Sequence, residues 1–378
     1  MAGAASTIAI AHDYLTQQGG AERVVLALSR AFPEAPIYTT LYDPATTFPE
    51  FGDRQVVTSP LNRLAFLRRD HRAALPLLAP ASNAVRIDAD VVIASSSGWA
   101  HGFRSTGRTL VYCHNPARWL YQTDQYLGDA GRLSPKRFAV TALGPALRRW
   151  DRRAAHRADR YLANSNVVRE RIAAAYGIEA DVVPPPPGLG TGGEQSAHRE
   201  LTDWQDRRFW LVVSRLMPYK NVDVVLDAFR DRPDDRLVIV GAGPERERLV
   251  QMLPPNARIV SGVSDAELRW IYAHAAGLIA PSHEDFGLTP LEANSWGLPV
   301  VALRAGGYLD TVVEGRSGLF FEEVQPAAVS RALDAASAHA WHQEVLKAHA
   351  QEFGEGRFAA RIRQEVERLL DGPAAPGP

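Results

Sequence analysis

The sequence contains very little cysteine and very little lysine. One of its 378 residues is cysteine, Cys113, which excludes an internal disulfide and a cysteine-rich zinc site. Three residues are lysine, namely Lys136, Lys220 and Lys347, so arginine supplies nearly all the positive charge. So little cysteine fits a reducing compartment, and we expect a cytoplasmic protein that reaches the inner face of the membrane only peripherally, if at all.

Long apolar runs and a large net charge are also missing. No run of 18 apolar residues occurs, which predicts that no helix spans a membrane. The N-terminus lacks a basic stretch followed by an apolar one, so no secretory signal is expected. A formal net charge of −1 argues against a general nucleic-acid binder. With 46% hydrophobic residues, the chain should be globular, and its length suggests two domains.

Short apolar runs recur along the chain, and glycine or polar residues follow them directly. In the N-terminal half these runs are 7–11, 36–40, 89–94, 109–113, 160–163 and 180–183. The first leads into a predicted loop, 12–20, which ends in Gly19 and Gly20, and then into a helical pattern over 21–32. Strands that alternate with helices in this way predict a doubly wound α/β domain with a parallel sheet.

The C-terminal half repeats the pattern after a break. Its apolar runs are 209–213, 237–240, 258–260, 276–280 and 299–302. The break is the segment 184–193, PPPPGLGTGG, in which prolines stiffen the chain and glycines loosen it. We therefore predict an N-terminal domain over 1–185 and a C-terminal domain over 186–355. Residues 356–378 should form an amphipathic helix and a tail, the helix packing back on the N-terminal domain.

The segment 281–297, PSHEDFGLTPLEANSWG, holds the strongest site pattern. Thr289 is predicted to be the N-cap of a helix, with Pro290 first and Glu292 third, which makes a capping box. The N–H groups at such a helix start favour a phosphate. Glu284 and Glu292 flank this point, and their carboxylates can accept hydrogen bonds from sugar or ribose hydroxyls. Alternatively, Glu292 only caps its helix and Glu284 is solvated.

Charged side chains follow other predicted strands. Arg215 and Lys220 come after 209–213, where a guanidinium and an ammonium suit a diphosphate. No Asp-x-Asp motif falls in these loops, so the two cations can replace a metal ion. His114 follows 109–113, and it belongs on the same edge of its sheet as Gly20 because ligands bind beyond the carboxyl ends of parallel strands.

Two basic segments lie in the N-terminal half. The first, 61–80, interleaves arginines with leucines: Arg63, Arg68, Arg69 and Arg72 with Leu61, Leu64, Leu67 and Leu75. The second, 146–160, contains six arginines. The first segment could lie on an anionic membrane surface. It could equally be a surface helix whose leucines pack inward and whose arginines are solvated.

Together these motifs resemble the retaining glycosyltransferases of family 4, which have the GT-B fold. Glu284 and Glu292 enclose seven residues, as in the E-x7-E motif of that family. The segments EDFGLTPLEANSWGLPVVALRAGG, SRLMPYKNVD, HDYLTQQGGAERVV and YCHNPARWLY look like the family too. The resemblance covers nearly the whole chain, and it implies two Rossmann-like domains facing a central cleft. One departure is that four prolines lead to Gly188, where the family usually has two and then an acidic residue.

The resemblance also implies roles for residues. Arg215 and Lys220 would hold the diphosphate of a nucleotide-sugar, Glu284 would contact the transferred sugar, and Glu292 the ribose. His114 would face the sugar from the acceptor side, and it joins Glu284, Arg215 and Lys220 as a catalytic candidate. Further donor contacts would come from Gly19, Gly20, Gly241, Val263, Phe286, Gly287, Leu288 and Thr289. No metal and no cofactor are expected.

The implied reaction is sugar transfer with retention of configuration. The EDFG and HDYL…GGAE forms look most like bacterial mannosyltransferases that use GDP-mannose, and a glycan, lipid-linked or small-molecule acceptor is expected. A UDP-sugar donor remains open. So do two other classes of protein: a sugar-nucleotide epimerase of the same fold, and a non-catalytic subunit that only binds the sugar nucleotide.

Overall fold

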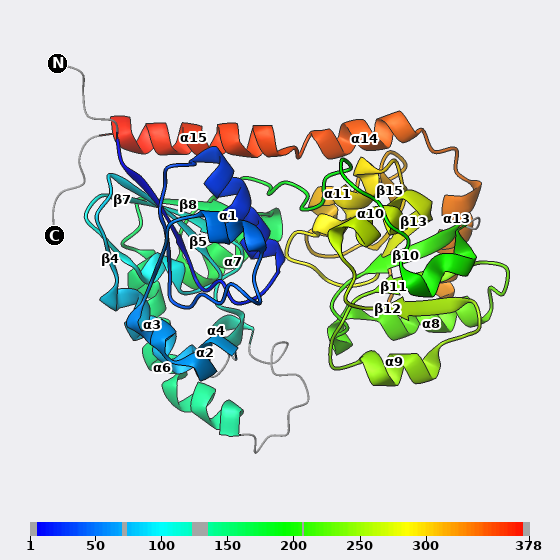
Figure 1. Ribbon diagram of the computed structural model, residues 1–378, viewed down its shortest axis with the longest axis horizontal. Helices are drawn as coiled ribbons and strands as arrows, with labels where there is room; N and C mark the ends of the chain where they lie inside the picture. The colour runs from blue at the N-terminus through cyan, green and yellow to red at the C-terminus, as the bar shows by residue number, and fades with distance from the viewer. Residues whose placement is uncertain (1–5, 70–73, 123–134, 206–207, 373–378) are drawn as a thin grey trace. The chain divides into compact units, whose positions relative to one another are not determined.

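The computed structural model describes residues 6–69, 74–122, 135–205 and 208–372 (Figure 1). The chain divides into two compact units, Met1–Pro186 with Glu355–Pro378, and Pro187–Gly354. Each unit is built around its own parallel sheet with helices packed on it, which confirms the predicted α/β class with two Rossmann-like domains. Within the described ranges, no helix is both long enough and apolar enough to cross a bilayer.

The first unit is organised around a seven-stranded sheet in the order β3-β2-β1-β5-β7-β8-β9, as far as the described residues go. Every neighbouring pair in it is parallel. The strands are β1 Ile8–His12, β2 Ile37–Thr39, β3 Val56–Thr58, β5 Val91–Ser96, β7 Arg108–Cys113, β8 Arg160–Ala163 and β9 Asp181–Val182. Two short strands, β4 Arg86–Ile87 and β6 Arg104–Ser105, pair with each other apart from this sheet.

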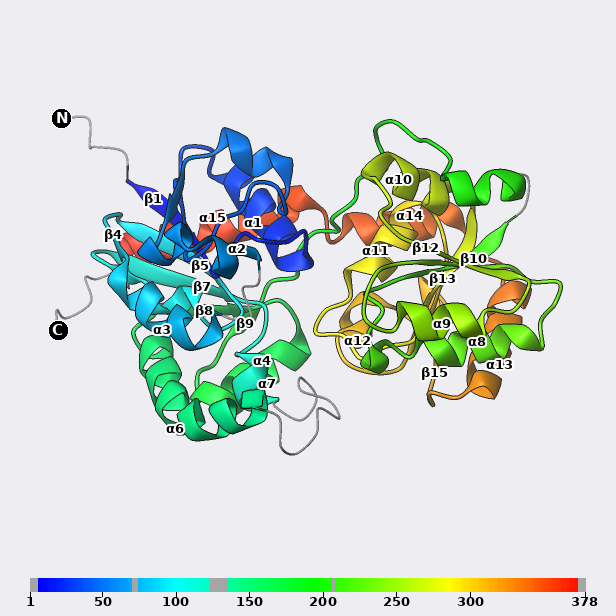
Figure 2. The ribbon, with the colours of Figure 1, turned by 60° about the horizontal axis from the view of Figure 1, so that its bottom comes forward.

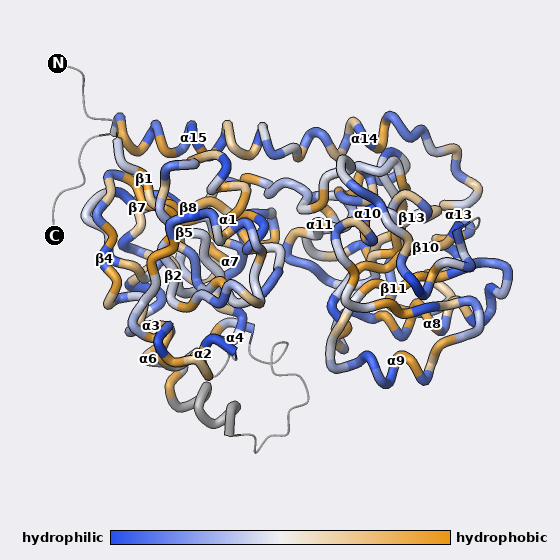
Figure 3. The backbone as a smooth tube through the Cα atoms, in the orientation of Figure 1, coloured by the Kyte–Doolittle hydropathy of each residue, from blue (hydrophilic) through white to orange (hydrophobic). Residues whose placement is uncertain are grey.

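Helices cover the first sheet, including one from the C-terminal end of the chain. They are α1 Gly20–Ala31, α2 Ala65–Arg69, α3 Leu75–Ala84, α4 Arg118–Tyr121, α6 Pro135–Ala155, α7 Asn166–Tyr176 and α15 Glu355–Asp371. Figure 2 shows α15 beside α1, and apolar and polar residues alternate along its tube in Figure 3. Phe358, Ile362 and Val366 of α15 are buried in the same core as Ile10 and Ile93 of the sheet. This helix therefore belongs to the core of the first unit.

The second unit has a six-stranded sheet in the order β12-β11-β10-β13-β14-β15 within the described part of the chain. The strands are β10 Phe209–Val213, β11 Leu237–Val240, β12 Ala257–Val260, β13 Ala275–Ala280, β14 Val300–Leu303 and β15 Gly318–Phe321. Its helices are α8 Val222–Arg230, α9 Arg246–Met252, α10 Asp265–His274, α11 Leu288–Ser295, α12 Tyr308–Thr311, α13 Pro326–Ala338 and α14 Gln343–Gln351. Two apolar cores flank the sheet, because its strands are buried on both faces.

In each sheet, the chain first adds strands on one side of its first strand and then continues on the other side. In the first sheet this switch point lies between β1 and β5, and in the second between β10 and β13. Loops that leave the carboxyl ends of the two strands at a switch point diverge, which opens a crevice for a ligand. The two switch points are therefore where a site is expected in each unit.

Two local predictions are wrong. The loop predicted from His12 starts one residue later, because His12 still pairs with Thr39 and Ser95 at the end of β1. The helix predicted to begin after an N-cap at Thr289 begins at Leu288 instead. Its N-cap is Gly287, whose φ of +88° turns the chain into the helix earlier. Thr289 and Glu292 therefore do not form a capping box.

Candidate functional site

An ion pair between Lys220 and Glu284 spans the switch point of the second sheet. Lys220 ends a short 3-10 turn, Pro218–Lys220, after β10, and Glu284 lies in the loop after β13. The Lys220 ammonium is buried, with 6% of the residue exposed, and it donates to Oε1 of Glu284. A buried lysine needs such a partner, because an uncompensated charge out of water is costly.

A chain of hydroxyl groups holds the same carboxylate from the other side. The Ser282 hydroxyl donates to Oε1 of Glu284 over 2.6 Å, so the Tyr308 hydroxyl, 3.2 Å away, donates to Ser282. Burial raises the pKa of Tyr308 well above its usual value, and the Glu284 charge adds to the rise. The phenol therefore stays a donor at neutral pH. Glu284 is only partly buried, and its other oxygen, Oε2, bonds to no described residue.

The loop that carries Glu284 is packed tightly against backbone and rings. The Gly307 N–H donates to the Glu284 carbonyl over 2.8 Å, and a Cβ at Gly306 would come within 2.4 Å of that oxygen. A Cβ at Gly287 would lie 2.6 Å from the Tyr308 ring. Asn221 adds a side-chain bond of 2.8 Å to the Pro281 carbonyl. These contacts fix the position of the Glu284 side chain before any ligand binds.

Arg215 lies on the exposed rim of the same strand end. Its guanidinium donates to the Tyr219 hydroxyl over 3.0 Å, and the Lys220 ammonium lies 5.2 Å from the centre of the Tyr219 ring. Tyr219 thus connects the two cations. The exposed guanidinium and the buried ammonium provide two positive charges for an anion at this edge of the sheet.

Glu292 is buried, and it does not cap its helix as predicted but accepts hydrogen bonds from Tyr272 and Gly188. Its Oε2 accepts a bond of 3.0 Å from the Tyr272 hydroxyl, and its Oε1 accepts one of 3.2 Å from the Gly188 N–H. Gly188 is the residue to which the four prolines lead. The carboxylate therefore fastens the beginning of the second unit to α11.

The other second-unit candidates are spread along the carboxyl edge of the sheet. Gly241 follows β11, where a Cβ would lie 1.9 Å from the Ser214 carbonyl, so only glycine fits. Val263 follows the edge strand β12, which is two strands from β10 and three from β13. Phe286 is buried against Phe353, which leaves only its main chain to meet a ligand. Gly287, Leu288 and Thr289 form the start of α11, where the first N–H groups have no partner inside the helix.

The first-unit candidates lie around the other switch point. Gly19 is the N-cap of α1 and Gly20 its exposed first residue. His114 directly follows β7, and its Nε2 lies 2.8 Å from the Ser95 hydroxyl. Gly19 has a structural reason to be glycine, because a Cβ there would lie 2.5 Å from the Glu22 carboxylate.

Sequence reasoning did not single out Ser282, Tyr308 or Tyr272. Ser282 could have been found, because it lies two residues before Glu284 in the same loop. The two tyrosines come from other elements, and no local pattern joins them to the glutamates. Over the described ranges, no three His, Cys, Asp or Glu side chains gather in a way that could hold a metal ion.

Comparisons with protein families cover both halves of the chain. The family model described as "Glycosyltransferase Family 4" matches residues 18–188, and the one described as "Glycosyl transferases group 1" matches residues 194–353. The two matches meet near the boundary between the two units.

Curated relatives carry matching names. The chain is 35% identical over 209 residues to a D-inositol 3-phosphate glycosyltransferase of Acidothermus cellulolyticus, covering 47% of this chain and 46% of that protein. It is 31% identical over 212 residues to a GDP-mannose-dependent alpha-(1-6)-phosphatidylinositol monomannoside mannosyltransferase of Mycolicibacterium smegmatis, covering 50% and 56%. A GDP-mannose-dependent alpha-mannosyltransferase of the same organism is 35% identical, covering 48% and 50%. The chain thus matches about half the length of these relatives.

Solved structures with the same fold extend over the whole chain. Sucrose-phosphate synthase from Thermosynechococcus elongatus superposes with a TM-score of 0.72 at 17% identity, covering 96% of this chain and 99% of that one. The Anabaena protein HepE in complex with UDP-glucose gives 0.69 at 18% identity, with coverage of 96% and 99%. The chain therefore contains a region that matches the family 4 glycosyltransferase model, residues 18–188, and one that matches the group 1 glycosyltransferase model, residues 194–353, on the GT-B fold of these solved structures.

Proposed function

We propose that this chain transfers mannose from GDP-mannose to an acceptor, with retention of the anomeric configuration and without a metal ion. The observation that carries the proposal is the Lys220–Glu284 pair at the switch point of the group 1 domain. It combines a buried cation with a carboxylate whose second oxygen bonds to no described residue. A cation suits the diphosphate of a nucleotide-sugar, and a carboxylate oxygen suits hydroxyls of the sugar.

The cations act on the leaving group. As the bond between the sugar and the phosphate breaks, negative charge builds up on the nucleoside diphosphate. A positive charge that is already in place stabilises that charge without reorganisation in the transition state. Lys220 and Arg215 have this role, and the N–H groups of Phe286–Thr289 at the start of α11 add to it. The leaving phosphate then takes the proton of the acceptor hydroxyl.

The two glutamates bind the donor at different points. Glu284, held at Oε1 by Lys220 and Ser282, uses Oε2 to accept hydrogen bonds from the transferred sugar. Glu292 accepts hydrogen bonds from the ribose hydroxyls. In the family 4 half, Gly20 approaches the phosphate and His114 contacts the sugar from the acceptor side.

The names of the relatives favour GDP-mannose over a UDP-sugar. Two of the mannosyltransferases are named as GDP-mannose-dependent. The HepE structures, in contrast, contain UDP and UDP-glucose, and at 18% identity they support the fold alone. UDP-glucose therefore serves as the reference donor against which GDP-mannose is tested.

A nucleotide screen followed by a turnover assay tests the proposal. GDP, UDP and ADP are each added during thermal unfolding, and a ligand at about 100 times its dissociation constant stabilises by about 2.7 kcal/mol. We expect GDP to give the largest shift and GDP-mannose to be consumed with release of GDP. Conversion of the sugar nucleotide without release of GDP would indicate an epimerase. Binding with no turnover, in the presence of water and a panel of acceptors, would indicate a binding subunit.

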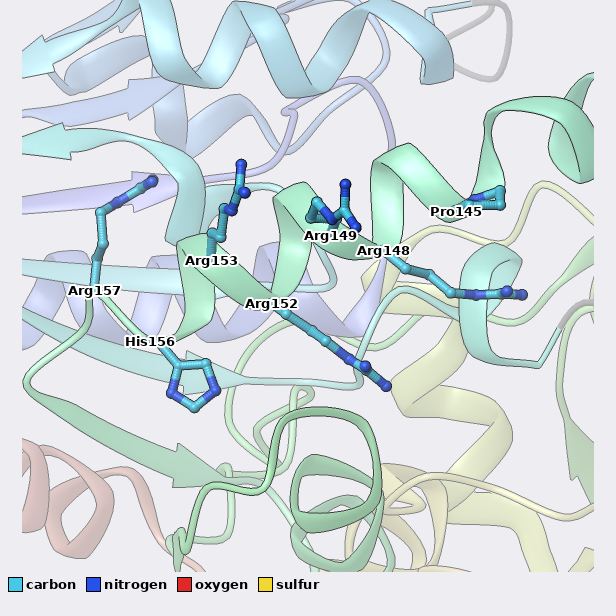
Figure 4. A pocket seen from close by; sticks show the side chains of 7 residues that line it. All are labelled: Pro145, Arg148, Arg149, Arg152, Arg153, His156 and Arg157. Atoms are coloured by element: carbon cyan, nitrogen blue, oxygen red, sulfur yellow. The ribbon is translucent and has the colours of Figure 1, made fainter.

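We further propose that the first unit touches an anionic membrane surface through α6 and its neighbours. Five arginines, Arg148, Arg149, Arg152, Arg153 and Arg157, line an open hollow together with Pro145 and His156. In Figure 4, Arg149, Arg153 and Arg157 point to one side of the helix, and Arg148, Arg152 and His156 to the other. None of the five pairs with an acid among the described residues, and the nearby Asp151 is buried against His101 and Tyr121.

Exposed apolar side chains lie on the same group of helices. Leu64, Phe66, Leu77 and Leu143 are each more than 40% exposed, and they come from the α2 region, α3 and α6. A common core that includes Leu67, Leu78 and Trp150 holds these helices together. The leucines of the basic segment 61–80 thus differ in exposure, because Leu67 packs inward whereas Leu64 is exposed. Arg72 and the side chain of Leu75 lie outside the described residues. Arginines mixed with exposed apolar groups suit a lipid surface, which favours a lipid-linked acceptor.

A further inference from the structure

The geometry points to a relay, Glu22–His12–Ser95, that holds the His114 ring in one neutral tautomer with its proton on Nδ1. The three residues are positioning residues, since they act on a ligand only through His114. That His114 contacts the sugar rests on the proposed function, whereas its tautomer does not. No role was predicted from the sequence for Glu22, His12 or Ser95, although the segment HDYLTQQGGAERVV contains the first two.

The relay crosses the switch point of the first sheet. His12 is the last residue of β1, Ser95 lies near the end of β5, and His114 follows β7 directly. These strands are neighbours in the order β1-β5-β7, and His12 is in register with Ser95. His12, Ser95 and Glu22 are each at most 1% exposed, whereas His114 is only half-buried. Buried groups therefore lead outward to one accessible ring.

The hydrogen atoms along the relay follow from one fixed acceptor. Nδ1 of His12 lies 3.0 Å from the Ser95 carbonyl oxygen, which can only accept, so Nδ1 carries a proton. The same N–H lies 3.2 Å from the Ser95 hydroxyl, whose oxygen accepts. Ser95 is fully buried, and among its described side-chain contacts only His114 Nε2, 2.8 Å away, can accept the hydrogen of its hydroxyl. Nε2 of His114 is thus an acceptor, and the neutral ring holds its proton on Nδ1.

Glu22 holds the inner end of the relay. Its Oε1 lies 3.9 Å from His12 Nε2 and accepts a bond of 3.0 Å from the Gln17 side chain. Its Oε2 is buried with no hydrogen-bond partner among the described residues. The carboxylate lies close to Gly19, where any Cβ would overlap it. A buried carboxylate beside an imidazole favours the ring that carries a proton on both nitrogens.

The charges near His12 also favour a protonated His12 ring. Burial alone would lower the pKa of His12, but the Glu22 carboxylate and the charge of Asp13 outweigh burial and raise it. Asp13 itself accepts bonds from the main-chain N–H groups of Ser97, Trp99 and Ala100. The Tyr112 ring packs edge-on against the His114 ring. The centres of the His12 and His114 rings are 6.5 Å apart.

A fixed tautomer decides what His114 offers a ligand. With the proton on Nδ1, the ring has a donor at that nitrogen and an acceptor at Nε2. With the proton on Nε2, the Ser95 hydroxyl would lose its acceptor and have to turn. For a histidine that binds a metal, removing the group that orients the ring typically costs about 10–100-fold in activity, and we expect an effect of the same order here.

The test is nitrogen NMR of the histidine rings in the full-length protein labelled with ¹⁵N-histidine. The His114 signals are assigned by their loss in His114→Gln. We expect one neutral tautomer, protonated at Nδ1, in the unaltered protein and a mixture in Ser95→Ala. The matched control is Ser96→Ala, the next residue of β5, equally buried, whose hydroxyl lies near His101 and bonds the Gly98 N–H. This control should leave the His114 signals unchanged, and melting temperatures show whether both variants fold.

Kinetics supply the second reading. Ser95→Ala should lower kcat/KM for sugar transfer at least tenfold, while the stabilisation by GDP stays the same because Lys220 and Arg215, the cations proposed to bind its diphosphate, lie in the second unit. A mixed tautomer in the unaltered protein, or an unchanged tautomer in Ser95→Ala, overturns the relay. If the tautomer behaves as expected but no sugar is transferred by any form of the protein, the relay stands and the proposed function fails.

Discussion

At the scale of single residues, Lys220 should decide donor binding and turnover. Lys220→Ala removes the buried cation and leaves Glu284 with Ser282 as its remaining partner. We expect activity to fall by about two to three orders of magnitude, the usual loss when a charge stabiliser at a leaving group is removed. Arg215→Ala should act in the same direction. Steady-state assays with GDP-mannose measure both.

Lys347→Ala is the matched control for this prediction. Lys347 is an exposed lysine that pairs with Glu344 on α14, so it changes the net charge equally without touching the candidate site. Near-normal turnover in Lys220→Ala and Arg215→Ala would refute the assignment of the two cations to the diphosphate.

Gly287 is a second residue whose replacement has a defined effect. Alanine at φ of +88° is strained by about 1–2 kcal/mol, and its Cβ would also meet the Tyr308 ring at 2.6 Å. Gly315→Ala separates the two causes, because Gly315 has φ of +73° with open space around it. We expect both variants to lose stability, Gly287→Ala more, and only Gly287→Ala to weaken nucleotide binding. Equal losses in chemical denaturation would show that the contact with Tyr308 is unimportant.

The buried pair of His12 and Glu22 should make stability depend on pH. Because the pKa of His12 is raised above 6.5 in the folded protein, its contribution is complete below 6.5. This contribution is lost as the pH rises through the folded value. Glu22→Gln removes the carboxylate and should flatten this part of the curve. The measurement is the free energy of unfolding of both proteins between pH 6 and 9, and parallel curves would contradict the prediction.

Sequence patterns found individual side chains better than they found their partners. Lys220 and Glu284 were selected separately, and only the fold brings them together across two strands. The capping box at Thr289 fits the local pattern, yet it is wrong, because Gly287 starts the helix first. Glu292 instead bonds Gly188, which is 104 residues away in the chain. A local pattern carries no information about a partner at that separation.

At the scale of elements, the C-terminal helix α15 should be essential to the stability of the first unit. Ile362 is fully buried in the core that contains β1 and β5. Ile362→Ala should cost about 2–5 kcal/mol, as large-to-small core replacements do. Glu367→Ala, at an exposed position of the same helix, is the control and should change little. Urea unfolding measures both, and a loss below 1 kcal/mol for Ile362→Ala would mean that α15 docks only loosely.

The elements that the sequence predicted well are the buried strands of the sheet interiors. A parallel strand covered on both faces is largely apolar, and β5, β7, β10 and β11 all have this character. Two edge strands, β3 and β15, escaped prediction. All three residues of β3 are only half-buried, and β15, GLFF, begins with glycine and is half-buried in its middle, so neither stands out as a buried apolar run.

At the scale of the whole molecule, both units place their polar cluster at the switch point of the sheet. The first has His12, Ser95 and His114, and the second has Lys220 and Glu284. The two clusters differ in charge: a neutral ring borders one, and cations border the other. This division suits a reaction in which the second unit binds an anionic donor and the first presents a hydroxyl acceptor.

The surface charge of the first unit leads to the last prediction. Each arginine near an anionic bilayer contributes about 1 kcal/mol, so replacing two should weaken vesicle binding about 30-fold at low salt. The double variant Arg149→Gln/Arg153→Gln removes two α6 cations that bond to no described residue. The control is the double variant Arg230→Gln/Arg248→Gln, which removes two positive charges from the second unit, where both arginines pair with acids. This control should sediment with vesicles as the unaltered protein does.

Sedimentation with anionic and neutral vesicles at low and high salt measures this binding. We expect the unaltered protein to sediment with anionic vesicles at low salt and to be released at high salt, because exposed charges are screened. Phe66→Ser, which removes an apolar side chain that is 62% exposed, should weaken the binding that persists in salt. If the protein stays in solution with anionic vesicles at low salt, the membrane contact is wrong. The α6 arginines would then have to bind an anion in solution, and a water-soluble acceptor would become the better candidate.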